Sequence, residues 1–325
     1  MVKKNNFKYT MKVIFHDNSL CMRGTTVALF DYAYFCKHMF NIECSIMYNN
    51  KHFDNNELVV NKFKKEFNIV KSYNDNIEMQ NLIDEVSPDA FFMVKGGKFD
   101  NIISRSCKNW INACSIVNKN DAYGDKFLVC SKWLSDLSGG LDYVPYMINL
   151  PDVKENLRDK LGIPKDAVVI GRNGGNTTFD LDFAKKSVID SIGRKDLYFL
   201  FQGTDKFFEH ERVIWLDASP DLEEKVKFIN TCDALLHARE LGESFGQTCA
   251  EFSSKNKPVM TWFGSKERNH IDILGDKGIY YNNYSDLLRI LQTFEVRDNI
   301  NFDCYQDYYP DVVMDRFKKL YLEWN

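Results

Sequence analysis

The chain has 325 residues, a formal net charge of -4 and a hydrophobic content of 44%. This length is about that of two domains, and the apolar content is ample for two cores, which excludes a disordered chain. The sequence contains no strongly basic block, which argues against nucleic acid as a partner. No stretch approaches the roughly 18 consecutive apolar residues that a membrane-spanning helix needs.

The nine cysteines are scattered along the chain, and none of them forms a Cys-x-x-Cys pair. Such spacing is typical of a protein that is kept reduced, and it favours neither a disulfide framework nor a zinc site. We therefore expect a cytoplasmic protein without a bound metal.

The first part of the chain alternates short apolar runs with segments of helical periodicity. The apolar runs predict buried strands at 12–15, 43–48, 68–71, 90–94, 113–117 and 127–130, and the periodic segments predict helices at 25–39, 57–67 and 77–86. Alternation of this kind is typical of a parallel, doubly wound sheet with helices on both faces.

Two prolines bracket a short extended piece, Val144–Asp152, which we interpret as an interdomain linker. The alternation then restarts, with strands predicted at 168–171, 198–201, 213–216, 234–237 and 259–262, and helices at 181–192, 222–230 and 247–253. Pro310 precedes a last amphipathic helix at 311–323. The pattern predicts an α/β protein with two Rossmann-like halves.

The most informative stretch begins at Glu243 and ends at Glu251, eight positions later. The first carboxylate lies in a loop and the second about one turn inside the following helix. Between them, the backbone amides of Phe245, Gly246 and Gln247 open the helix, and free amides at the positive end of a helix dipole suit a diphosphate. The glycine also lets the backbone approach a ligand closely. The alternative is an ordinary helix start with solvated glutamate caps.

This stretch resembles the Glu-x7-Glu motif of retaining GT-B glycosyltransferases, particularly those of family 4. The resemblance covers nearly the whole chain and includes Val129–Leu134, Val144-Pro145, Ile170–Arg172, Phe201–Gly203, Asp221–Ala234 and Lys257–Met260. It implies two Rossmann-like, doubly wound domains that face each other across a cleft. Residues 1–148 would form the acceptor-side domain, 149–305 the donor-binding domain, and 306–325 a helix that crosses back to the first domain.

The resemblance also implies roles for individual residues. Glu243 would bind hydroxyls of the donor sugar, Glu251 the ribose hydroxyls, and Arg172 would neutralise charge on the leaving diphosphate. The other donor-binding residues that it implies are Phe245, Gly246, Gln247, Thr248, Gly24, Gly203 and Thr204. The co-substrate would be a UDP- or GDP-sugar, with no bound cofactor and no metal.

The sequence departs from the family pattern in three places, one of which is the motif itself, where Ser244, Gln247 and Thr248 replace the usual Gly, Leu and Pro. A lysine usually follows the arginine six residues later, but Thr178 stands there. Either the backbone amides of the Gly174-Gly175 loop replace this cation or the activity is weak. The histidine expected after the fourth strand of the N-terminal domain is also not evident, and Lys95 lies in that region.

Three further residues are candidates for the cleft. His16 ends the first strand, His237 ends the strand before the motif, and Lys95 follows the fourth strand. Each has an ordinary alternative, namely a loop histidine, a strand-end histidine whose hydrogen bonds are satisfied, and a solvated loop lysine.

The resemblance favours a retaining glycosyltransferase that moves a sugar from a nucleotide sugar to a glycan, glycoprotein or lipid-linked acceptor, with at most peripheral membrane contact. The alternative is a nucleotide-sugar-binding pseudoenzyme or scaffold of the same fold. An epimerase would need further cleft acids, for which no motif is visible, and a phosphorylase would be far longer. An NAD-dependent oxidoreductase is disfavoured because no Gly-x-Gly-x-x-Gly follows the first strand.

Overall fold

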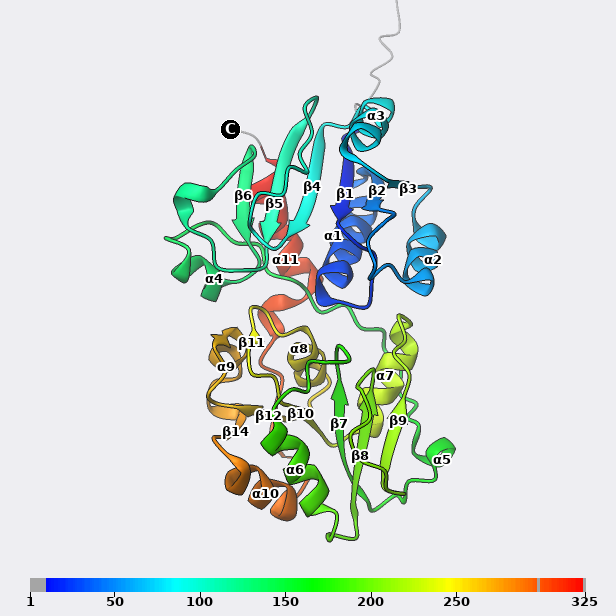
Figure 1. The fold of residues 1–325 in the computed structure, drawn as a ribbon, viewed down its shortest axis with the longest axis vertical. Coiled ribbons are helices and arrows are strands. Elements are labelled where there is room, and N and C mark those ends of the chain that lie inside the picture. Colours follow the sequence, from blue (N-terminus) through cyan, green and yellow to red (C-terminus); the bar gives the residue numbers. More distant parts are fainter. Residues whose placement is uncertain (1–9, 297–298, 324–325) are drawn as a thin grey trace, which may run out of the picture. The chain divides into compact units, whose positions relative to one another are not determined.

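The computed structural model describes residues 10–296 and 299–323. The chain divides into two compact units. Unit 1 runs to Cys130 and also takes in Ser135–Val144 and the chain from Met314 onward, whereas unit 2 consists of Ser131–Leu134 and Pro145–Val313. Each unit contains one six-stranded parallel sheet with helices packed against it (Figure 1).

The sheet of unit 1 has the strand order β3-β2-β1-β4-β5-β6. Its strands are β1 (Lys12–Asp17), β2 (Glu43–Asn49), β3 (Ile69–Tyr73), β4 (Ala90–Lys95), β5 (Lys108–Ala113) and β6 (Lys126–Val129). The helices in this part of the chain are α1 (Gly24–Phe40), α2 (Glu57–Glu66), α3 (Asn76–Val86) and α4 (Lys132–Leu137). The order reverses beside β1, so the loop after β1 opens at the switch point where such sheets bind ligands.

The last helix of the chain completes the core of unit 1. Pro310 is the first residue of α11 (Pro310–Phe317), a position where its missing N–H costs nothing. A short π-helical turn, Lys318–Leu322, follows. The Phe317 ring lies 5.3 Å from that of Tyr32, between ring centroids, and the hydroxyl of Tyr321 donates to the carbonyl of Ile111 over 2.7 Å.

The strand expected at 113–117 is wrong, because β5 occupies Lys108–Ala113 instead. This strand contains two buried asparagines, which hide it from a search for apolar runs. The structure accommodates them by hydrogen bonds: the side-chain amide of Asn109 donates to the carbonyl of Ser104 and that of Asn112 to the carbonyl of Val144. A buried amide is tolerated where such partners exist.

The sheet of unit 2 has the order β14-β12-β10-β7-β8-β9. Its strands are β7 (Val168–Asn173), β8 (Leu197–Gln202), β9 (Val213–Leu216), β10 (Ala234–His237), β12 (Val259–Trp262) and β14 (Ile279–Tyr281), and a separate two-stranded ribbon joins β11 (Gly242–Glu243) to β13 (Glu267–Arg268). The helices are α5 (Arg158–Leu161), α6 (Asp182–Ser191), α7 (Leu222–Thr231), α8 (Gln247–Ser254), α9 (Asn269–Leu274) and α10 (Tyr284–Thr293). Its core gathers side chains such as Phe199, Leu236, Met260 and Leu287.

Six of the strands and α-helices described in unit 2 are absent from the sequence prediction: α5, α9, α10, β11, β13 and β14. Most of these elements are too short to show a hydrophobic periodicity in the sequence. Helix α10 is long enough, and its start is capped by Asn283, whose side chain accepts from the backbone amide of Asp286. No helix in the described chain is both long and apolar enough to cross a membrane.

Candidate functional site

The candidate donor-binding residues of unit 2 gather at the carboxyl ends of three neighbouring strands. Arg172 lies in β7 and Gly174 directly after it, Gly203 and Thr204 follow β8, and His237 ends β10. Helix α8, with Glu243 just before it, begins after β10. Because carboxyl ends of parallel strands meet at one edge of a sheet, residues that are distant in sequence form one group.

The N-terminus of α8 presents unpaired backbone amides. Gly246 precedes the helix with φ 93°, and a Cβ there would lie 2.9 Å from the Cβ of His270. The residue therefore has to be glycine for both conformational and steric reasons. Within the described chain, the amides of Gly246, Gln247 and Thr248 have no hydrogen-bond acceptor. They are free to bind an anion.

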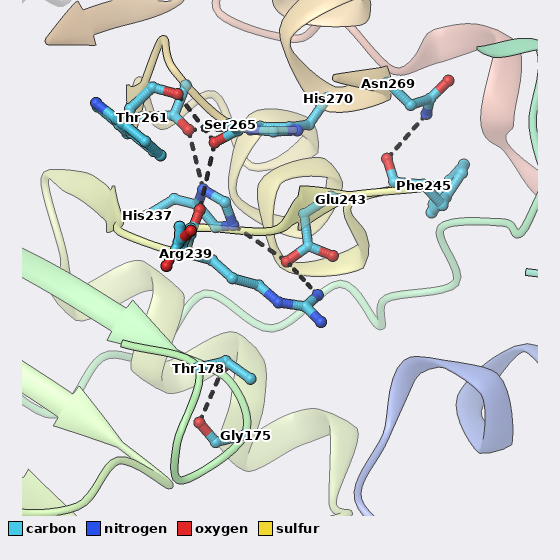
Figure 2. Close-up of polar contacts among 12 residues, drawn as sticks. Gly175, Thr178, His237, Arg239, Glu243, Phe245, Thr261, Ser265, Asn269 and His270 are labelled. Atoms are coloured by element: carbon cyan, nitrogen blue, oxygen red, sulfur yellow. Dashed lines mark hydrogen bonds and ion pairs between the residues drawn. The ribbon is translucent and has the colours of Figure 1, made fainter. Parts of the chain in front are cut away.

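Phe245 anchors this turn in the core of unit 2. Its ring is buried and lies 5.4 Å from that of Tyr308 and 5.5 Å from that of Tyr146, between ring centroids. Its carbonyl accepts from the side-chain amide of Asn269 over 3.0 Å (Figure 2). What Phe245 can offer a ligand is thus its backbone, while its side chain fixes the turn.

The side chains of the next two residues also bear on the site. The amide Nε2 of Gln247 donates to the carbonyl of Met147 over 3.1 Å, and its buried Oε1 has no partner in the described chain. Thr248 is a half-buried residue, and its hydroxyl likewise has no partner among the described residues.

Arg172 is buried, and its guanidinium is fixed on one side only. Nη2 donates to the hydroxyl of Thr178 over 2.7 Å and to the carbonyl of Gly175 over 3.3 Å. Nη1 is buried without a partner in the described chain. Burial lowers the pKa of Arg172 to about 10, against the opposing effect of Glu243, so the group is charged at neutral pH. An unpaired buried cation of this kind suits an anionic ligand.

Thr178, which stands where a lysine was expected, holds this arginine. Its hydroxyl donates to the carbonyl of Gly175 over 3.0 Å (Figure 2), so its oxygen is left to accept from Nη2 of Arg172. The loop from Asn173 to Thr178 contains no lysine or arginine, so it supplies no second cation beside Arg172. The threonine instead orients the one that is present.

Two glycines make room around the arginine. A Cβ on Gly174 would lie 2.3 Å from Nη1 of Arg172, so only glycine leaves the guanidinium where it is. Gly203 has φ 62°, and a Cβ there would lie 3.0 Å from the carbonyl oxygen of Gly174. The loops after β7 and β8 therefore touch, and Thr204 at their junction donates to the carbonyl of Gln202.

One of the two carboxylate oxygens of Glu243 contacts other side chains of the protein. Oε1 accepts from Nε2 of His237 over 3.1 Å and pairs with Nη1 of Arg239 over 3.2 Å (Figure 2). Oε2 has no partner within the described chain, and the side chain is 24% exposed. Burial alone would raise the pKa of Glu243, but the hydrogen bond from His237 and the nearby positive charges outweigh it and lower the pKa to about 2. The free oxygen is an ionised acceptor at neutral pH.

Glu251 lies in α8 and is only 3% exposed. Its Oε1 pairs with Nζ of Lys225 on α7 over 2.8 Å. The sequence analysis did not identify Lys225, and nothing in its helical context marks it, since the pair forms only when α7 and α8 pack together.

The remaining candidates lie in unit 1. Gly24 is the first residue of α1. His16 in β1 is buried, with Nε2 at 2.8 Å from the hydroxyl of Tyr73, and burial together with Lys95 lowers its pKa. Lys95 ends β4, and its Nζ binds Asp100 over 2.7 Å and Asn18 over 3.0 Å. With its side chain 2% exposed, this lysine is not a solvated loop residue.

In the part of the chain that the structure describes, no three His, Cys, Asp or Glu side chains come together as metal ligands would.

No protein-family model matches the sequence, and no curated protein matches it. Solved structures do match. HepE from Anabaena, in complex with UDP and glucose, superposes with a TM-score of 0.73 at 12% identity, over 97% of this chain and 100% of that one. A glycosyltransferase from Rickettsia africae gives 0.68 at 11% identity (96% and 98%), and a UDP-N-acetylglucosamine 2-epimerase gives 0.59 at 10% identity (96% and 95%).

Identities this low establish the fold and nothing beyond it. Glycosyltransferases of the GT-B fold are among the matches, and each match extends over nearly the whole chain. Together with the two parallel six-stranded sheets, this confirms the predicted fold: the chain is an α/β protein of the GT-B type with two Rossmann-like parts.

Proposed function

We propose that the protein is a glycosyltransferase that takes its sugar from a nucleoside-diphosphate sugar, with UDP as the preferred nucleotide. The observation that carries this proposal is that a buried, half-free Arg172 guanidinium and the free amides at the start of α8 both lie at the carboxyl edge of one sheet. A diphosphate supplies the anionic oxygens that both groups lack. HepE, which shares the fold, was solved with UDP and glucose.

The other candidate residues would bind different parts of the nucleotide sugar. Oε2 of Glu243 would accept from hydroxyls of the sugar, and the second oxygen of Glu251 would bind the ribose beside its Lys225 pair. Gly203 and Thr204 would lie along the base. The role of Gly24, in unit 1, rests on the family resemblance alone, whereas His16 and Lys95 are candidates because they lie at the ends of strands β1 and β4.

We further propose that transfer retains the configuration at the sugar. The bond between the anomeric carbon and the phosphate oxygen breaks, and the acceptor hydroxyl oxygen bonds to the same face of that carbon. The hydroxyl proton passes to an oxygen of the departing diphosphate. Arg172 and the α8 amides stabilise the negative charge that grows on that diphosphate, and charge of this kind is the largest demand on such a site.

A second candidate is a nucleotide-sugar epimerase, which the match to the UDP-N-acetylglucosamine 2-epimerase favours. Product analysis distinguishes an epimerase from a glycosyltransferase. Incubation with UDP-N-acetylglucosamine and no acceptor would yield the 2-epimer from an epimerase. A glycosyltransferase would leave the donor unchanged or hydrolyse it slowly.

Thermal unfolding in the presence of UDP, GDP, ADP and CMP, with and without attached sugars and without added metal, tests the proposal. A ligand at 100 times its dissociation constant stabilises the folded state by about 2.7 kcal/mol, which raises the midpoint by several degrees. We expect UDP and a UDP-sugar to give such a rise and CMP to give none. Equal midpoints in all samples would contradict nucleotide-sugar binding and leave a scaffold of the same fold.

Gly174→Ala tests whether the arginine needs its present position. The new methyl group would collide with Nη1 of Arg172 and displace the guanidinium from its present position. We expect the UDP-induced rise in the unfolding midpoint to fall by at least half. Gly193→Ala is the matched control, because nothing lies within 4 Å of its Cβ. Equal responses to UDP in the two variants would remove Arg172 from the diphosphate site.

A further inference from the structure

A row of buried polar side chains lies behind Glu243. His237 ends β10 and pairs in register with Thr261 of the neighbouring strand β12. Nδ1 of His237 lies 2.9 Å from Oγ1 of Thr261, which in turn lies 3.0 Å from Nε2 of His270 at the start of α9 (Figure 2). Thr261 and His270 are fully buried, and the two histidine rings lie 4.8 Å apart between centroids.

The carboxylate of Glu243 fixes the direction of the first hydrogen bond, and the neutral form of His237 gives the directions of the others. The carboxylate of Glu243 can only accept, so Nε2 of His237 carries a hydrogen. In the neutral ring, Nδ1 is then an acceptor, and the hydroxyl of Thr261 has to donate to it. The oxygen of Thr261 is left to accept from Nε2–H of His270. Burial lowers the pKa of His270 to about 3, so that ring is neutral.

We propose that His237, Thr261 and His270 are positioning residues, a relay that holds Oε1 of Glu243 and leaves Oε2 directed at a hydroxyl of the donor sugar. The ligand in this statement rests on the proposed function, whereas the relay itself does not. None of the three need touch the substrate. Their effect passes through the orientation of one carboxylate.

The surroundings of Glu243 show why the relay matters. Arg239 contacts the same oxygen as His237, but its side chain is 28% exposed and it is not part of the buried row. His237 is fixed at both ends, because the hydroxyl of Tyr281 donates to its carbonyl over 2.8 Å and Thr261 holds its ring. Without Thr261 the imidazole could rotate or change tautomer, and the carboxylate would lose its fixed donor.

A pair of variants at Thr261 tests the relay. Thr261→Val removes the hydroxyl and keeps the volume and β-branching that suit a strand, whereas Thr261→Ser keeps the hydroxyl. Titration calorimetry would compare UDP with UDP-glucose in both. We expect Thr261→Val to lose about tenfold in affinity for UDP-glucose relative to UDP, which is the worth of one well-placed hydrogen bond, and Thr261→Ser to keep the wild-type ratio. A merely structural threonine would lower the unfolding midpoint and leave this ratio unchanged.

The ring nitrogens of His237 give a readout that needs no ligand and no altered chain. In the nitrogen-15 spectrum of the wild-type protein, we expect Nε2 of His237 to carry a hydrogen, because its carboxylate partner can only accept. The opposite tautomer would overturn the relay. If the wild type bound no nucleotide sugar at all, the proposed function would fail, while this spectrum would still decide the relay. Donor binding with an unchanged UDP-glucose to UDP ratio in Thr261→Val would refute the relay alone.

Discussion

Replacing Arg172 by alanine is expected to lower the rate of sugar transfer by about 100- to 1000-fold, the usual effect of removing one preorganised group that stabilises developing charge. The structure supplies the reason. Nη1 of Arg172 is a buried donor without a partner in the described chain, and Nη2 is fixed by Thr178. Nη1 can therefore donate a hydrogen bond to the departing diphosphate and stabilise the negative charge that develops on it.

Arg172→Lys sharpens the result. A lysine keeps the charge but has no planar fork, so it cannot reproduce the fixed geometry in which Nη2 binds Thr178 while Nη1 faces a phosphate. We expect its rate to lie much closer to that of Arg172→Ala than to the wild type. Arg289→Ala, at an exposed position of α10, serves as the control and should transfer at the wild-type rate. Wild-type turnover in Arg172→Ala would disprove the assignment of the diphosphate site.

Glu243→Ala is expected to abolish measurable transfer and to weaken binding of UDP-glucose by about ten- to a hundredfold, because a hydrogen bond to a charged group contributes about 1.5–3 kcal/mol. Affinity for UDP alone should change little, since the carboxylate is proposed to touch only the sugar. The variant also leaves His237 and Arg239 without their shared acceptor, so its unfolding midpoint should fall by a few degrees.

Glu240→Ala separates these effects from a general change of charge. Glu240 lies close to Glu243 in sequence but is exposed, and it pairs with Lys266 on the surface. Exposed pairs contribute little, so stability and transfer should both stay near the wild-type values. Retained turnover in Glu243→Ala, or equal losses of UDP and UDP-glucose affinity, would contradict a contact with the donor sugar.

The contrast between His237 and Thr261 shows where the sequence was informative about the site. His237 is visible as a strand-end residue before a recognisable motif, with an ordinary strand-end histidine as the alternative. In the structure, its two ring nitrogens and its carbonyl are hydrogen-bonded to Thr261, Glu243 and Tyr281, and its ring lies beside that of His270. Thr261 lies within a correctly predicted strand, yet nothing in its spacing marks it, because its partner is set by the register between β10 and β12.

The local pattern of apolar and polar residues was enough to predict many of the strands and helices of this protein. Apolar runs and helical periodicity identify the strands at 213–216, 234–237 and 259–262 to the residue, and Gly246 marks the turn that opens α8. These features depend on neighbours within a few positions, which is why one sequence suffices to find them. The strand Lys108–Ala113 escaped because its buried asparagines are satisfied by residues outside the strand.

Only the tertiary structure decided which oxygens and nitrogens are occupied and which are free. The partners of Arg172, Glu243 and Glu251 include Thr178, His237 and Lys225, and two of these three pairs join different secondary-structure elements. Hydrogen bonds act over about 3 Å, so they depend on register and helix packing, which no local pattern of residues encodes. The free half of the guanidinium and the free oxygen of Glu243 are therefore properties of the fold, although the residues that bear them could be identified from the sequence.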